Sequence, residues 1–318
     1  MTVAPLAHVT RSGFLECVHH GAAVALDASG SAAVRVGDPS AVVLPRSSLK
    51  PVQLLAMLRA GVDLPGPQLA LAAASHSGEP FHVEGVAAIL RAAGLSEQDL
   101  RNTPDLPIEP GERLRWQCAG RAAVPMAQNC SGKHAAMLAT CAANDWPLDS
   151  YLDPAHPLQR LVRETIAELT GEPVDVVAVD GCGAPAFGTT LDGLARAFAT
   201  LARAEPGTPE ARVAAAIREH PEYLGGTGRD VTALIRAVQG LIAKDGAEGV
   251  YAAALPDGRA AALKIADGAA RARQPVMVAL LRRLGVEEIA DDLAHVAVLG
   301  HGEPVGEVTA APFDRPDP

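Results

Sequence analysis

Residues 16–38 read ECVHHGAAVALDASGSAAVRVGD, which is two runs of β-forming residues around the turn signal DASG. Such runs predict paired strands within a strand-rich stretch that we place at residues 6–44. Strands are also predicted near the other end of the chain, as a hairpin over 249–268 with its turn at PDG and a last strand over 295–302. Strands at both ends with helices between them predict an α/β chain of the α+β type, in which both ends build one antiparallel or mixed sheet beside a helical lobe.

Helical periodicity fills the middle of the chain. Apolar residues recur there at spacings of three and four. Gly61 and Gly94 follow the first two predicted helices, at about 48–60 and 82–93. A short buried strand running into a glycine-rich loop is expected at 174–188, and the Pro-rich stretch 101–127 is expected to be irregular. No repeat or linker interrupts the chain, so we expect one domain over 1–318. The helices are predicted at about 48–60, 82–93, 132–145, 157–170, 191–204, 208–219 and 270–284.

Composition excludes several classes of protein. The formal net charge of −10 lacks the electrostatic footprint of a nucleic-acid binder. The longest apolar runs fall far below the length of a membrane span, and the first residues show no signal peptide. The five cysteines form no CxxC pair, which favours reduced thiols. We therefore expect a cytoplasmic protein with no nucleic-acid or membrane partner.

Lysine is scarce in this chain. Of the 27 basic residues, only four are lysines, and the other 23 are arginines. Lysine can lose its proton when it is desolvated, whereas arginine stays charged. The lysines are therefore candidates for chemistry, although four leftover surface lysines would explain the same count. They are Lys50, Lys133, Lys244 and Lys264.

The stretch PRSSLKPVQLL at 45–55 places Ser47 three residues before Lys50, at the start of the first predicted helix. On a helix both side chains lie on one face. A serine there sits at the positive end of the helix dipole, and a lysine disfavoured as a cation by burial is able to accept the serine proton. Ser48 competes as nucleophile or cap, but its spacing to Lys50 does not suit one face. A capped helix start with a solvated lysine is the ordinary alternative.

Two further segments concentrate reactive side chains before predicted helices. ASHSGEPFH at 74–82 holds two serines, two histidines and a glutamate, and its Ser77 or Glu79 could simply cap the next helix. NCSGKH at 129–134 gathers a cysteine, a lysine and a histidine within one turn of a helix start. Packing alone does not require this density, although a buried cysteine in a capped helix start would also account for the second segment.

The segment DGCGAP at 180–185 ends the expected buried strand with an acid and a thiol between glycines. Asp180 is suited to hold a substrate ammonium group. Cys182 could join Cys130 at a soft metal site such as zinc, although no fixed spacing between the two supports zinc. Lys264, on the second strand of the late hairpin, has the position of the strand lysine that faces the nucleophile in serine β-lactamases, but the letters around it differ.

The order of these motifs resembles the rhizobial-type (class 3) L-asparaginases, the asparaginase II family. The resemblance covers about residues 8–285. It implies a fold similar to serine β-lactamases, penicillin-binding proteins and glutaminases, with an antiparallel sheet flanked by helices and a helical lobe. The motifs that carry it are RSSLKP, ASHSGEPFH, NCSGKHAAML, DPAHPLQ, DGCGAP, AKDGAEGVY and LKIADG.

The resemblance implies hydrolysis of L-asparagine to L-aspartate and ammonia by two serine–lysine pairs, with zinc near the substrate. The first pair is Ser47 with Lys50, where Ser47 attacks the amide and backbone N–H groups hold the oxyanion. The second pair is Ser75 with Lys264, and Ser77 and Lys244 are alternatives. The implied zinc ligands are Cys130, Lys133 and Cys182. The expected substrate contacts are Asp180 to the α-ammonium and Arg46 or His134 to the α-carboxylate.

Other functions fit parts of the pattern. A glutaminase or related amidase differs by one methylene of substrate, which changes binding by only about 1–3 kcal/mol. A penicillin-recognising enzyme is disfavoured because no export signal is present. A non-catalytic protein that binds metal or an amino acid would leave the serine–lysine pairs without a role. We expect an enzyme that works on a small molecule as a homodimer.

Overall fold

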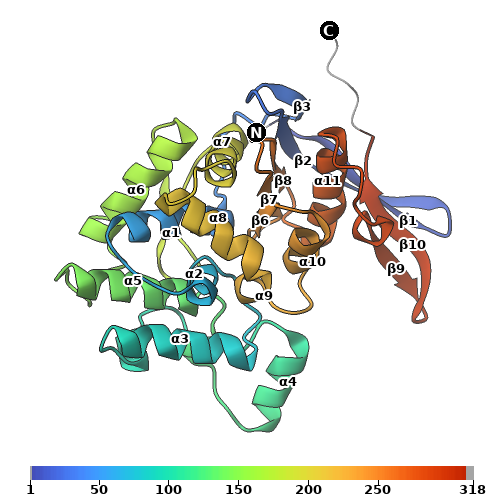
Figure 1. Cartoon of the computed structure of the whole chain (residues 1–318). Helices are drawn as coiled ribbons and strands as arrows, with labels where there is room; N and C mark the ends of the chain where they lie inside the picture. Colours follow the sequence, from blue (N-terminus) through green and yellow to red (C-terminus); the bar gives the residue numbers. More distant parts are fainter. Residues whose placement is uncertain (1, 313–318) are drawn as a thin grey trace.

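The computed structural model describes residues 2–312 (Figure 1). Both ends of the chain build one antiparallel sheet, as the sequence predicts. The strands run in the order β6-β7-β8-β2-β1-β10-β9, and β3 pairs with β2. The strands of this sheet are β1 Ala4–Arg11, β2 Phe14–Leu26, β3 Ala32–Val36, β6 Ile242–Asp245, β7 Val250–Ala254, β8 Ala260–Ile265, β9 His295–Gly300 and β10 Glu303–Ala310.

Small side chains let the sheet and its helices approach closely. Strands β7 and β8 pair through facing alanines, among them Ala253 with Ala261. A Cβ on Gly21 of β2 would lie 2.0 Å from the carbonyl oxygen of Lys264, so only glycine allows β8 to lie this close. Two helices, α7 Leu191–Ala202 and α11 Ala270–Arg283, pack on either side of strands β7 and β8 (Figure 1).

The middle of the chain forms the predicted helical lobe. Apolar faces of these helices bury residues such as Leu54, Leu71 and Leu138 in one core that continues into the sheet. None of the described helices is long and apolar enough to cross a membrane. The remaining helices are α1 Lys50–Arg59, α2 Gly66–Ala72, α3 Pro80–Ala92, α4 Pro110–Cys118, α5 Ser131–Ala143, α6 Pro157–Thr170, α8 Pro209–Glu219, α9 Pro221–Leu224 and α10 Asp230–Ala237.

Two predictions about local structure are wrong. Residues 174–188 form not one buried strand but a separate two-stranded hairpin, β4 Val177–Val179 and β5 Pro185–Phe187, because the glycine-rich loop turns the chain back on itself. The stretch 101–127 contains α4, which begins after the capping side chain of Glu109. The hairpin matters for the site because its loop carries Asp180 and Cys182.

Candidate active site

The turn before α1 separates the roles of the two adjacent serines. A short 3₁₀ helix, Arg46–Leu49, leads into α1, and residues three apart are aligned in such a helix. Ser48 is buried, and its hydroxyl donates to the carbonyl oxygen of Lys244 at 3.1 Å. Ser47 is only half-buried. The geometry therefore uses Ser48 to join the turn to strand β6 and leaves Ser47 at the more accessible side.

The approach between this turn and β6 is close. A Cβ on Gly246 would lie 2.5 Å from the carbonyl oxygen of Pro45 and 2.8 Å from Ser48 Oγ. Arg46 adopts left-handed backbone angles, with φ of 54°. Non-glycine residues held in this region are strained and cluster at functional sites. The turn that carries Ser47 is thus fixed against the sheet in a conformation that the surrounding contacts impose.

Lys50 is the first residue of α1 and is 1% exposed. Its Nζ donates to the carbonyl oxygen of Ala74 and lies 3.1 Å from both Ser75 Oγ and Cys130 Sγ. The amine therefore links three of the segments that the sequence singles out. Its hydrogen-bonding serine is Ser75, which is also buried, and not Ser47.

The structure distinguishes Ser75 from Ser77 by their partners. Ser77 Oγ donates to the carbonyl oxygen of Gly225 at 3.0 Å and lies tightly against Gly226. It joins the loop after α2 to the loop before α10. Ser75 faces the buried amine of Lys50 instead. Of the two candidates, Ser75 is the one whose hydroxyl contacts the Lys50 amine.

The predicted pairing of Ser75 with Lys264 does not appear among the hydrogen bonds of the described residues. Lys264 is half-buried, and its Nζ donates to the carbonyl oxygens of Glu248 and, at 3.2 Å, Ile265. Burial lowers the pKa of Lys264. The structure thus pairs Ser75 with Lys50 and occupies the Lys264 amine with backbone carbonyls.

The three predicted metal ligands converge beside Lys50. Lys133 Nζ lies 3.3 Å from Cys182 Sγ. A hydrogen bond from Cys130 lowers the pKa of Cys182 to about 4, and the same bond together with burial raises the pKa of Cys130 to about 12. Although burial alone would lower it, the two thiols hold the pKa of Lys133 above its ordinary value.

This donor set fits a soft cation. Two sulfurs and an amine supply three of the four ligands of a tetrahedral zinc and leave one position open. Among residues 2–312, no group of three or more His, Cys, Asp or Glu side chains is arranged to hold a metal. The fit therefore depends on Lys133 as a ligand, which requires its amine to lose its proton.

The expected substrate contacts differ in accessibility. Arg46 Nε and Nη2 donate to Asp180 Oδ1 at 2.9 and 2.5 Å, and both side chains are partly exposed. Although burial alone would raise it, the hydrogen bond from Arg46 and the charge of Lys133 hold the pKa of Asp180 below its ordinary value. This pair offers a cation and an anion for the two charged groups of an α-amino acid.

His134 is buried behind the site rather than open to it. Its Nδ1 lies 2.8 Å from the hydroxyl of Tyr151, and its Nε2 has no partner among the described residues. Burial lowers the pKa of His134 well below its ordinary value. A neutral, buried imidazole is a poor contact for a substrate carboxylate, so the geometry favours Arg46 for that role.

A third buried lysine lies next to the site. Lys244 on β6 is fully buried, and its Nζ lies 2.5 Å from Asp245 Oδ1. Burial lowers the pKa of Lys244 to about 8 despite this carboxylate. The sequence offers Lys244 only as an alternative, and Asp245 was not predicted as a site residue, although an acid directly after one of four lysines was a signal that could have found it.

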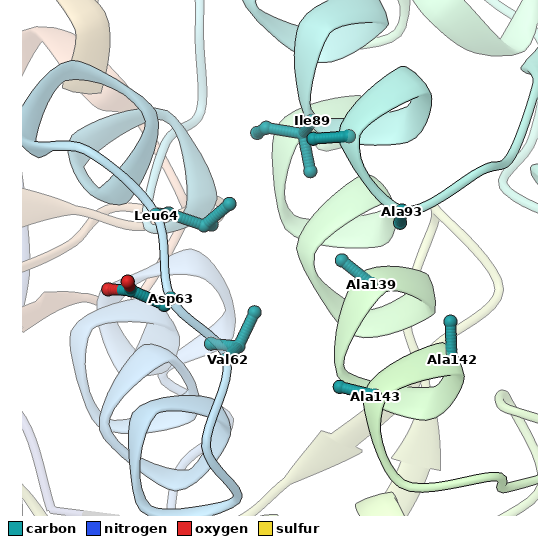
Figure 2. Close-up of a pocket in the computed structure, with 9 residues that line it drawn as sticks. Val62, Asp63, Leu64, Ile89, Ala93, Ala139, Ala142 and Ala143 are labelled. Atoms are coloured by element: carbon teal, nitrogen blue, oxygen red, sulfur yellow. The ribbon is translucent and has the colours of Figure 1, made fainter.

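An apolar cavity of about 320 Å³ lies away from these groups, between α3, α5 and the loop after α1. Figure 2 shows Ile89 and three alanines of α5 facing this cavity, while the carboxylate of Asp63 points away from it. Asp63 is held by Arg212 at 2.8 Å. The cavity therefore presents no group for amide chemistry, in contrast to the cluster around Lys50.

Comparison with known proteins shows the family of this chain. The family described as L-asparaginase II has a model that matches residues 7–310. The chain belongs to the L-asparaginase II family. This assignment confirms the resemblance seen in the motifs and makes the chain an asparaginase-type amidohydrolase with a small-molecule substrate. No curated protein matches the chain.

Solved structures show weaker likeness to this L-asparaginase II family member. A β-lactamase from Mycobacterium bovis has a TM-score of 0.44 at 15% identity and covers 83% of this chain and 94% of its own. Mglu in its tris and glutamate form has a TM-score of 0.43 at 15% identity, with 85% and 61% covered. EstCE1, a hydrolase with promiscuous acyltransferase activity, has a TM-score of 0.42 at 11% identity, with 89% and 93% covered. The family assignment rests on the family model.

Proposed function

We propose that this protein is an L-asparaginase that hydrolyses L-asparagine to L-aspartate and ammonia through an ester on Ser47. The observation that carries the proposal is the buried amine of Lys50, 3.1 Å from Ser75 Oγ at the foot of the turn that presents Ser47. Membership of the L-asparaginase II family supplies the substrate class. The Arg46–Asp180 pair supplies a cation and an anion suited to the carboxylate and ammonium of an amino acid.

In the first half of the reaction, Lys50 accepts the proton of Ser47, and Ser47 Oγ attacks the side-chain amide carbon. Backbone N–H groups of the turn stabilise the oxyanion, helped by the positive end of the α1 dipole. The C–N bond then breaks. Ser75, hydrogen-bonded to Lys50, relays the proton to the leaving nitrogen, which departs as ammonia. In the second half, water attacks the ester, Lys50 and Ser75 carry its proton, and aspartate leaves with Ser47 restored.

The second lysine of the proposed site is Lys244 rather than Lys264. Lys244 is fully buried and close enough to Lys50 for the Lys50 charge to help lower its pKa. Lys264 is half-buried, and backbone carbonyls occupy its amine. Lys244 therefore offers the site an amine that can be uncharged near neutral pH, the state that a proton acceptor needs.

Zinc, if bound, is proposed to be held by Cys130, Lys133 and Cys182. It would supply a Lewis acid that polarises a substrate oxygen and favours its orientation. The serine nucleophile does not require this contribution. The homodimer also stays a prediction of the sequence.

Ammonia release from asparagine and from glutamine tests the proposal directly. We expect hydrolysis of asparagine, with loss of turnover in Ser47→Ala and retention in Ser48→Ala, because the Ser48 hydroxyl is used to bind β6. Trapping of an aspartyl ester on Ser47 by rapid acid quench and mass spectrometry identifies the nucleophile. An active Ser47→Ala enzyme would rule out the mechanism, and preference for glutamine would make the protein a glutaminase of the same family.

A further inference from the structure

A buried network of charges surrounds Lys244 from several elements. Asp245 Oδ1 accepts from Lys244 Nζ at 2.5 Å, and its other oxygen lies 2.8 Å from Arg229 Nη2 and 3.1 Å from Arg273 Nη2. Arg273 Nη2 also lies 2.9 Å from Asp230 Oδ2. Arg273 Nη1 donates to the carbonyl oxygen of Gly246 at 3.1 Å, which ties the network to the strand end beside the Ser47 turn.

The formal charges in this network balance without Lys244. Arg229 and Arg273 carry two positive charges, and Asp230 and Asp245 carry two negative ones. Arginine does not lose its proton in proteins, so the surplus cation of the cluster is the lysine. A surplus charge that is fully buried is costly, and neutralisation of the ionisable group is the usual response.

Burial of Lys244 and the charge of Lys50 also favour the uncharged form of its amine. Its own strand contributes Asp245, whose Oδ1 and carbonyl oxygen accept from Lys244 Nζ at 2.5 and 2.7 Å and favour the charged amine, whereas the positive charges of Arg229 and Arg273 on the other carboxylate oxygen oppose it. From α1, the charge of Lys50 opposes a second cation. Burial is the largest cause of the lowered pKa of Lys244, and Asp245 only partly offsets it. The titratable and charged groups that face Lys244 or its carboxylate are Lys50, Arg229, Asp230, Asp245, Tyr251 and Arg273.

We propose that Arg273 and Asp230 are positioning residues that set the charge of Lys244 beside the serine–lysine site in opposite directions: Arg273 favours the uncharged amine, and Asp230 limits that effect. Arg273 acts by competing with Lys244 for Asp245, and Asp230 acts by holding Arg273 and limiting that competition. The role in the reaction rests on the proposed function, whereas the protonation of Lys244 is a property of the fold. The two can therefore be tested separately.

The two residues have opposite expected effects. In Arg273→Met, Asp245 is left with fewer cations, so Lys244 is needed as its partner and keeps its proton to higher pH. In Asp230→Asn, Arg273 has Asp245 as its remaining carboxylate partner in the network and pairs with it more strongly. Lys244 is then less favoured as the partner of Asp245 and loses its proton at lower pH. A charge within about 4–6 Å shifts a pKa by about 1–3 units, and both residues act on Lys244 through Asp245. General destabilisation would not produce shifts of opposite sign.

NMR titration of the lysine side chains reads this protonation without any activity. The chain has only four lysines, so a sample with ¹³C-labelled lysine gives four Cε signals, and the Lys244 signal is assigned by its absence from Lys244→Met. We expect it to titrate near pH 8 in the wild type, at least about one unit higher in Arg273→Met, and lower in Asp230→Asn. Arg273→Lys should restore the wild-type value in part because it keeps the charge.

Arg271→Met is the matched control. Arg271 lies on the same helix and is exposed, and its Nε donates to His19 rather than to the network. Its loss removes the same charge and should leave the Lys244 titration and the catalytic rate unchanged. If Arg273→Met does not fold, Asp230→Asn against this control decides the question.

The pH profile of kcat/KM for asparagine then tests the link to the reaction. The limb that reflects loss of the Lys244 proton should move with the NMR value, up in Arg273→Met and down in Asp230→Asn. A wild-type Lys244 that titrates near the ordinary lysine value of about 10.4, or shifts of the same sign in both variants, would overturn the proposal. A pH profile that stays fixed while the NMR value moves would overturn the role in the reaction. A wild-type protein that hydrolyses neither amide would instead refute the proposed function and leave the NMR result standing.

Discussion

Replacing Ser75 and Ser77 with alanine, one at a time, separates catalysis from structure within a single loop. Ser75 Oγ lies 3.1 Å from the Lys50 amine, and Ser77 Oγ donates to the Gly225 carbonyl at 3.0 Å. Both side chains are buried, so both variants remove one buried hydroxyl. We expect Ser75→Ala to lose activity and Ser77→Ala to lose only stability.

The expected sizes follow from the partners left behind. In Ser77→Ala, the Gly225 carbonyl still accepts from the Ser77 N–H at 2.8 Å, so the cost is one hydrogen bond, about 1 kcal/mol. For a chain of this length that lowers Tm by about 2 °C. In Ser75→Ala, Lys50 keeps its contacts with the Ala74 carbonyl and Cys130 Sγ, so the stability cost is similarly about 1 kcal/mol. Loss of the proton relay, however, should lower kcat about 100-fold or more.

The assay pairs calorimetric melting with ammonia release from asparagine at saturating substrate. Similar Tm shifts with a large kcat loss confined to Ser75→Ala would support the assignment. A Ser75→Ala enzyme that keeps its kcat, or a Ser77→Ala enzyme that loses as much, would refute the reasoning. Ser75→Thr keeps a hydroxyl and serves as a check that the loss follows the proton relay.

Three further predictions concern other parts of the site. Lys244→Met should lower kcat about 100-fold while Lys264→Met keeps most of it, measured by ammonia release, because of these two amines only that of Lys244 is fully buried. Cys182→Ser should lower the zinc content of the purified protein, measured by mass spectrometry of the metal. Cys141→Ser is the control, because Cys141 is also buried but lies on α5 outside the proposed ligands, and it should leave the zinc content unchanged. Burial lowers the pKa of His82 from 6.5 to about 4, so between these pH values the unfolded chain binds a proton that the folded chain does not. The contribution of His82 to the free energy of unfolding is therefore present above pH 6.5 and falls by about 2 kcal/mol by pH 5. His82→Gln should flatten that part of the stability–pH curve measured by urea unfolding.

The fold follows from the sequence where the periodicity is strong and local. The helices at 157–170 and 270–284 and the hairpin with its PDG turn are confirmed almost to the residue. Strand β6 and the last strand β10 were not predicted, because a four-residue buried strand and a strand that contains glycine and proline lack a clear alternation. Helix α4 was missed because none of its side chains is buried, so it has no apolar face to reveal it.

The sequence predicts which residues belong to the site, but not which of them form hydrogen bonds with one another. The motifs predict a cluster, and the structure brings Lys50, Ser75 and Cys130 together from three separate segments. Sequence spacing pairs Ser47 with Lys50, whereas the hydrogen bond of the amine runs to Ser75, because Lys50 points beneath the loop after α2. Which side chains from distant segments form hydrogen bonds depends on how the segments pack. The residues next to Lys50 in the sequence therefore do not indicate which serine hydroxyl its amine contacts.

The scarcity of lysine acquires a physical meaning in this structure. Lys50, Lys133 and Lys244 are each no more than 1% exposed, whereas most arginines lie at the surface or in ion pairs. A buried arginine such as Arg273 remains a cation and needs carboxylates around it. A buried lysine can give its proton up instead. Arginine therefore fixes the charge of the surrounding network, whereas the proposed proton transfer at Ser47 uses the buried lysines Lys50 and Lys244.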